Sequence, residues 1–244
     1  MTATIQPGDI LLMTRIEDLF IKVLCKCICE LDNYPAGLAP VCHAAIIDRN
    51  LTVASMEESG LNVETLDHVL SCAGHCWQYR VKDPAANLIP VLDRIDYYEK
   101  QAVPYAFMDY ALLPFIVLSR KIAIDTLPLA QRIELRGVID ECCQKIENLI
   151  RINKNALICS ELVFRCLTEG GVPIEILNAI QYSNWTGSYL RPNQLELLIK
   201  LRDNLNTLAG VVSFHVFDGE PLPNWVTPGD LLGSSSLTLI SQLK

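Results

Sequence analysis

The residue whose position most favours chemistry is Cys159. Residues 156–158 are apolar, and from Cys159 onward the apolar residues follow helical spacing until Gly170 and Gly171. The sequence therefore predicts a helix that begins at or near this cysteine. A helix N-terminus carries about half a positive charge from its unpaired N–H groups, which stabilises a thiolate. Because the same N–H groups can bind an oxyanion, Cys159 is the thiol with a physical reason to be reactive.

A nucleophilic thiol needs a base, and two histidines lie in surroundings that give them a special role. His43 is in the strand-like run 41–47, and His215 is in the similar run 211–217. A polar side chain among apolar neighbours is costly unless it is paired. Residue types alone leave these two histidines as equal candidates for the base, and the alternative for each is a satisfied core or edge histidine. His68 and His75 lie in more polar surroundings.

The elements around these residues are predicted to be mixed strands and helices. A Pro-Gly-Asp turn at residues 7–9 precedes a short strand, and Thr14 with Glu17 forms a capping-box pattern that predicts a helix over residues 15–31. Two apolar runs, 41–47 and 51–56, form a hairpin signal. Further strands are expected at 60–63 and 77–81, and a short helix at 66–70. Residues 90–151 are predicted to be helical, most clearly from 129 to 150.

Composition bounds the class of protein. The chain has 244 residues, half of them hydrophobic, and a net charge of −8. This length fits one domain, residues 1–244, with a helical insertion at about 87–152. The acidic balance argues against a nucleic-acid partner, and the apolar runs are too short for an integral membrane segment. The N-terminus lacks the basic region of a signal peptide, so we expect a cytoplasmic protein, with export by a signal-less route left open.

Ten cysteines are a high count, and without a secretion signal the expectation is reduced thiols. Most should be small core residues. Cys72, His75 and Cys76 have metal-like spacing, and a zinc site would need a fourth ligand such as Cys142 or Cys143. Three further cysteines, at positions 25, 27 and 29, lie together on a predicted helix. A structural protein stabilised by zinc at the cluster of Cys72, His75 and Cys76 is one alternative.

Six short blocks follow one another in an order that resembles a known family. They are Pro7-Gly8-Asp9-Ile10-Leu11, His43-Ala44-Ala45-Ile46-Ile47, residues 60–66, residues 103–107, Ile158-Cys159-Ser160-Glu161-Leu162-Val163 and Thr227-Pro228-Gly229-Asp230-Leu231. Together they resemble the circularly permuted NlpC-type branch of the papain-like cysteine hydrolases, specifically the YiiX-like group. Lecithin retinol acyltransferase-like proteins are cousins of this group. The order, with the histidine before the cysteine, distinguishes the permuted branch from ordinary papain-like chains.

The resemblance implies a role for each matching residue. Cys159 would be the nucleophile, and His43 the general base that takes its proton and returns it to the leaving group. In the family a third residue, on the strand after the histidine strand, orients the imidazole. With a three-residue turn at 48–50, Ser55 would pair across from His43, and strand alternation puts Glu57 on the same face two residues on. Serine carries no charge to stabilise an imidazolium, so Glu57 is the alternative orienting residue.

The resemblance also implies a fold and a pocket. The fold would be α+β and permuted papain-like, with a small antiparallel sheet or partial barrel and the nucleophile helix packed on it. The oxyanion donors would include the backbone N–H of Cys159, and the two residues assigned to the oxyanion and pocket region are Ser160 and Tyr105. The alternative for Tyr105 is a core aromatic residue. A Cys–His pair needs no metal and no organic cofactor, so none is expected.

The predicted function is a thiol hydrolase that cleaves an amide, peptide or acyl bond through an acyl-enzyme on Cys159. The substrate would be a small peptide, an amino-acid conjugate or a lipid-like molecule, and the related acyltransferases pass the acyl group to an amine or alcohol instead. An alternative from another class is a weak or inactive relative that binds a small conjugate or a protein partner in the same cleft. The sequence leaves the oligomeric state open.

Overall fold

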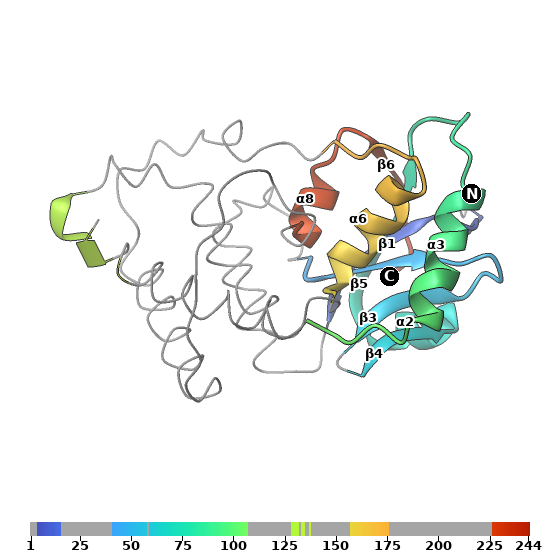
Figure 1. The fold of residues 1–244 in the computed structure, drawn as a ribbon, viewed down its shortest axis with the longest axis horizontal. Coiled ribbons are helices and arrows are strands. Elements are labelled where there is room, and N and C mark those ends of the chain that lie inside the picture. The colour runs from blue at the N-terminus through green and yellow to red at the C-terminus, as the bar shows by residue number, and fades with distance from the viewer. Residues whose placement is uncertain are drawn as a thin grey trace.

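The computed structural model describes residues 4–15, 41–57, 59–106, 128–131, 133–134, 137, 157–175 and 226–244 of the chain. Within them the fold is α+β, as predicted, and its centre is a six-stranded antiparallel sheet (Figure 1). The strand order is β4-β3-β2-β1-β5-β6, and the sheet is open rather than closed into a barrel. The N-terminal strand therefore lies near the middle of the sheet, and the C-terminal strand lies at one edge.

Six strands and four helices are fully described. The strands are β1 (Ile10–Arg15), β2 (His43–Ile47), β3 (Val53–Glu57), β4 (Gly60–Glu64), β5 (Ala73–Val81) and β6 (Leu237–Gln242). The helices are α2 (Leu66–Cys72), α3 (Ile89–Lys100), α6 (Cys159–Glu169) and α8 (Pro228–Leu232). The predicted hairpin, the strand at 60–63, the helix at 66–70 and the helix from Cys159 are all confirmed, and β5 begins four residues earlier than expected.

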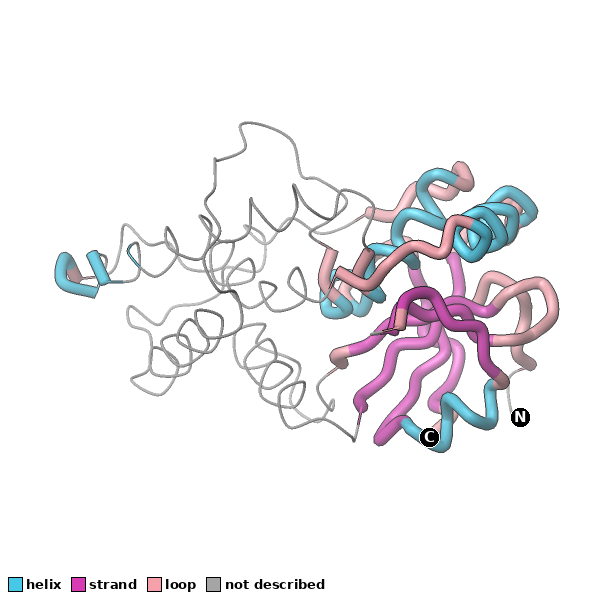
Figure 2. The backbone as a smooth tube through the Cα atoms, turned by 60° about the horizontal axis from the view of Figure 1, so that its bottom comes forward, coloured by secondary structure: helices cyan, strands magenta, loops and turns pink. Residues whose placement is uncertain are grey.

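The two faces of the sheet carry separate apolar cores. One core joins alternate strand residues, among them Leu12, Ala44 and Ile46, to α3 and α6. The other core contains the intervening strand residues, among them Met13 and Ala45, together with Val69 of α2. Both faces of the central strands are buried, which explains why β1 and β2 read as continuous apolar runs. Figure 2 shows helices lying along one side of the sheet.

The hairpin between β2 and β3 differs from the predicted register. Ile47 pairs with Val53, and Ile46 pairs with Ala54, so five residues connect the strands instead of three. The Asp48 carboxylate closes this connection, because it accepts hydrogen bonds from the backbone N–H groups of Asn50 and Thr52 at 2.8 Å and from the Thr52 hydroxyl at 2.7 Å. The prediction that Ser55 pairs across from His43 is therefore wrong: continued along the strands, the register sets His43 opposite Glu57.

The two Pro-Gly-Asp segments form different structures. The first is a turn before β1, in which Gly8 has a φ of +85°. The second begins α8, where Thr227 and Asp230 form a reciprocal capping box. Their similarity is thus limited to the sequence. The predicted capping box of Thr14 is also wrong, because Thr14 lies inside β1.

Several predictions fall outside the described residues. They are the helix over 15–31 except for Arg15, the strand at 211–217 with His215, most of the insertion at 87–152 and the cysteines at 25, 27, 29, 142 and 143. Across the parts of the chain that the structure does describe, no helix is long and apolar enough to cross a membrane.

Candidate functional site

The structure brings His43, Ser55 and Glu57 into one cluster. His43 Nε2 lies 3.3 Å from Glu57 Oε1, and the two side chains are 7% and 14% exposed. The Ser55 hydroxyl donates a hydrogen bond to the same carboxylate oxygen at 2.9 Å. Because β3 runs antiparallel to β2, the register carries Glu57 to the start of β2, where His43 lies. The carboxylate therefore contacts the imidazole directly, and Ser55 contacts the carboxylate.

This cluster has the chemistry of an oriented base. A carboxylate beside an imidazole fixes the ring and stabilises its protonated form. His43 Nε2 and Glu57 Oε1 form an ion pair when the imidazole is protonated, and a base held in this way can take a proton from a thiol. Glu57 takes the place that the hairpin prediction gave first to Ser55, and a charged partner stabilises an imidazolium better than a hydroxyl does.

Cys159 is the first residue of α6, as the sequence predicts. The residue before it, Ile158, is extended, with φ −93° and ψ 167°, and its side chain makes no capping hydrogen bond. On a helical wheel Cys159 shares a face with Leu162, Val163 and Cys166, all of them buried. The thiol is therefore directed at the sheet, and Cys159 is 0% exposed.

The described structure leaves the thiol and the imidazole apart. No hydrogen bond between described residues joins Cys159 Sγ to His43. Cys159 belongs to the core that contains Ala44 and Ile46. His43 pairs with Met13, which belongs to the core on the other face. Since neighbouring residues of a strand alternate between faces, His43 lies on the face away from α6.

Ser160 and Tyr105 both lie near the start of α6. The Ser160 hydroxyl is buried and donates a hydrogen bond to the backbone carbonyl of Val226 at 2.6 Å. Tyr105 forms an isolated parallel bridge with Leu157, two residues before the cysteine. Tyr105 is partly buried and packs against the core that contains Cys159. The hydroxyl of Ser160 thus links α6 to the segment before α8.

Sequence reasoning missed a charged cluster between α6 and α3. Glu161 is fully buried, and its Oε1 lies 2.7 Å from Arg165 Nε. Arg165 is also 3.6 Å from Glu169, which accepts a hydrogen bond from the Tyr98 hydroxyl at 2.9 Å. Burial would lower the pKa of Arg165, but the Glu161 carboxylate and the Tyr98 hydroxyl together offset it, so that the pKa is raised. The four-residue spacing of these three side chains on α6 was the available signal.

The structure gives no support to the metal reading of Cys72, His75 and Cys76. His75 is exposed and stacks on Trp77, with ring centroids 5.7 Å apart. Cys76 is buried, and desolvation raises its pKa to about 12. Within the described ranges, no group of three or more His, Cys, Asp or Glu side chains is placed to hold a metal ion. The cysteines described, at positions 42, 72, 76, 159 and 166, are free thiols.

A comparison of the chain with models of protein families, with curated proteins and with solved structures finds no match. The family resemblance carried by the short sequence blocks therefore stays a prediction.

Proposed function

We propose that the chain is a thiol hydrolase in which Cys159 is the nucleophile, His43 the base and Glu57 the residue that orients the base. The observation that carries the proposal is the contact between His43 Nε2 and Glu57 Oε1 at 3.3 Å. Burying two titratable side chains on neighbouring strands costs more folding free energy than burying apolar residues. We infer that this pair is retained for a functional role. The N-terminus of α6 supplies the positive end that a thiolate and an oxyanion need.

The reaction has two covalent steps. The Cys159 sulfur attacks the carbonyl carbon of an amide or ester, and its proton passes to His43. The bond to the leaving group breaks, and His43 returns the proton to the leaving nitrogen or oxygen. Water then attacks the resulting thioester with His43 as base, which releases a carboxylic acid and restores the thiol. Because His43 lies on the face of the sheet away from α6, this mechanism requires a rearrangement at the start of β2 that brings the imidazole to Cys159 when substrate binds.

The test is the pH dependence of Cys159 alkylation. Wild-type protein and the variants His43→Ala and Glu57→Gln are treated with limiting iodoacetamide from about pH 5 to pH 9, and each cysteine is quantified by peptide mass spectrometry. An ordinary thiol titrates near pKa ~8.5, so an activated one reacts at clearly lower pH. We expect low-pH reactivity at Cys159 that both variants diminish. Cys166 is the matched control, since it is another buried cysteine of α6.

One structural observation favours a second candidate function. Cys159 is 0% exposed, and His43 lies on the other face of the sheet from α6. A relative that binds a small conjugate or a protein partner without cleaving it would need no contact between the two residues. If Cys159 reacts no faster than Cys166 at any pH, and His43→Ala changes nothing, the hydrolase is ruled out and the binding function takes its place.

A further inference from the structure

We propose that residues 226–232 form a cover over the N-terminal end of α6, and that this cover must open before Cys159 can react. The proposal rests on the proposed function only in taking Cys159 as the reacting thiol. The cover is joined to α6 next to the cysteine, because the Ser160 hydroxyl donates to the Val226 carbonyl at 2.6 Å. Ser160 is 0% exposed and Val226 is 3% exposed. Solvent is therefore excluded from this hydrogen bond.

The cover is a small rigid unit rather than a loose loop. The Thr227 hydroxyl accepts a hydrogen bond from Asp230 N at 2.9 Å, and the Asp230 carboxylate accepts one from Thr227 N at 2.8 Å. These reciprocal bonds fix the first turn of α8 directly after Val226. Leu231 is 0% exposed and lies in the same apolar core as Cys159. Figure 1 shows α8 beside α6, and the two helices are in contact.

The consequence is a closed site. A nucleophile must reach a carbonyl carbon at van der Waals distance, which a thiol with 0% exposure does not do from outside. Displacing residues 226–232 breaks the hydrogen bond between Ser160 and Val226, removes the Val226 and Leu231 side chains from the core, and uncovers the end of α6 at which Cys159 lies. Such a local opening has its own equilibrium, separate from global unfolding. The hydrogen bond of Ser160 is the part of that equilibrium that a single substitution can change.

The experiment measures access to Cys159 in the full chain. Wild type, Ser160→Ala and Thr168→Ala are treated with limiting iodoacetamide at about pH 8, and the rates at Cys159 and Cys166 are compared by peptide mass spectrometry. Thr168→Ala is the matched control, because its hydroxyl also donates to a backbone carbonyl, that of Phe164 at 2.9 Å, at the other end of α6. Loss of a hydrogen bond of ordinary net strength should raise the Cys159 rate about fivefold in Ser160→Ala.

The expected result is a faster reaction of Cys159, relative to Cys166, in Ser160→Ala and not in Thr168→Ala. An unchanged Cys159 rate overturns the cover, and so does an equal rise at both cysteines, which would mean general loosening of α6. Repeating the series with His43→Gln separates this proposal from the proposed function. If Ser160→Ala still raises the Cys159 rate, but His43→Gln does not change the pH profile of Cys159 alkylation, the cover exists without a hydrolase. If His43 alters the profile but Ser160→Ala has no effect, the hydrolase stands and the cover is refuted.

Discussion

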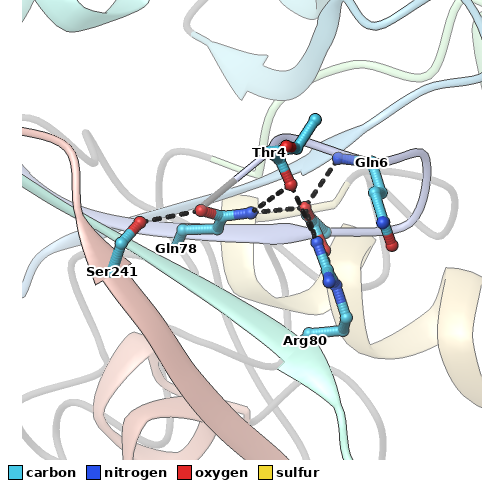
Figure 3. A network of polar contacts seen from close by, with 6 residues as sticks. Thr4, Gln6, Gln78, Arg80 and Ser241 are labelled. Carbon is cyan, nitrogen blue, oxygen red and sulfur yellow. Dashed lines mark hydrogen bonds and ion pairs between the residues drawn. The ribbon is translucent and has the colours of Figure 1, made fainter. Parts of the chain in front are cut away.

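Replacing Asp9 by alanine should destabilise the protein by about 3 kcal/mol, because it breaks a buried ion pair from one side. Asp9 is buried, with 1% of its surface exposed. It accepts hydrogen bonds from Arg80 Nε at 2.6 Å, from a second Arg80 nitrogen at 2.8 Å, from Gln78 Nε2 at 2.6 Å and from the backbone N–H of Gln6 at 2.8 Å. Figure 3 shows how this network ties the segment before β1 to β5.

The size of this loss of stability depends on which hydrogen bonds Gln78 and Arg80 keep when the Asp9 carboxylate is removed. Gln78 is 0% exposed, so its amide nitrogen would keep only the contact with Thr4 O at 3.4 Å, while its amide oxygen still accepts a hydrogen bond from the Ser241 hydroxyl at 2.8 Å. The Arg80 side chain is 28% exposed and retains a bond to the same carbonyl at 3.1 Å, so water can compensate it in part. Breaking a fully buried pair costs about 3–5 kcal/mol, and the partial exposure of Arg80 puts Asp9→Ala at the lower end. For a chain of this size that is a fall in Tm of about 6–12 °C.

Thermal unfolding followed by circular dichroism measures this effect. Arg49→Ala is the control, because Arg49 pairs with Asp93 and Asp96 on the surface, where ion pairs contribute little. The double variant Asp9→Ala/Arg80→Ala should lose less stability than the sum of the two single variants, since it leaves no unpaired charge. Equal Tm values for Asp9→Ala and Arg49→Ala, or strict additivity in the double variant, would refute the reasoning.

Three further predictions concern packing, ionisation and the base. Gly170→Ala should cost about 1–3 kcal/mol, since its Cβ would lie 2.6 Å from the carbonyl oxygen of Cys166 in α6 and 2.7 Å from the backbone of α3. Gly137→Ala is the control: Gly137 is helical with nothing within 4 Å, so this change should not lower the Tm. Burial raises the pKa of Cys76 to about 12 from 9.0, so the stabilisation from its neutral thiol is complete below pH 9 and lost between pH 9 and about 12. Denaturant titrations across that pH window should show the falling free energy of unfolding, and Cys76→Ala should abolish this part of the pH dependence. Glu57→Gln removes the negative charge 3.3 Å from His43, so the imidazole should hold its proton less tightly, and an unshifted NMR titration would mean that the contact does not form in solution.

Local patterns in the sequence were sufficient for most of the described elements. The apolar runs of β2 and β3, the helical spacing after Cys159 and the stop at Gly170 depend on neighbouring residues alone, and each appears in the structure where it was predicted. The order of the strands does not depend on neighbouring residues. β6 pairs with β5, more than 150 residues earlier in the chain, and no short motif encodes such a pairing.

The Asp48 side chain sets the register of the hairpin between β2 and β3, and this register determines which residue meets His43. A three-residue connection would have set Ser55 against His43. The Asp48 carboxylate instead holds a five-residue connection, in which Leu51 has a φ of +63°. The two extra residues carry Glu57, rather than Ser55, to the histidine. A non-glycine residue with positive φ is uncommon, so the residue types at 48–52 did not predict this turn.

The face on which His43 lies is not encoded by β2 itself. Its other residues are Ala-Ala-Ile-Ile, so the two faces of the strand are equally apolar, and a slip of one residue would exchange alanine for alanine and isoleucine for isoleucine. What sets the face is the pairing of β2 with β1, in which Leu12 meets Ala44 and Met13 meets His43.

A slip of β2 would break that pairing along the whole strand, four residue pairs in the middle of the sheet. Opening at the start of α6 breaks the hydrogen bond between Ser160 and Val226 and uncovers the buried side chains of Val226 and Leu231, but it leaves the backbone pairing of the sheet intact. Movement at the N-terminal end of α6 is therefore expected to expose Cys159 while the sheet stays fixed. On this reasoning, disulfide-trapping of residues 226–232 against α6 should suppress Cys159 reactivity, and cross-linking β1 to β2 should not.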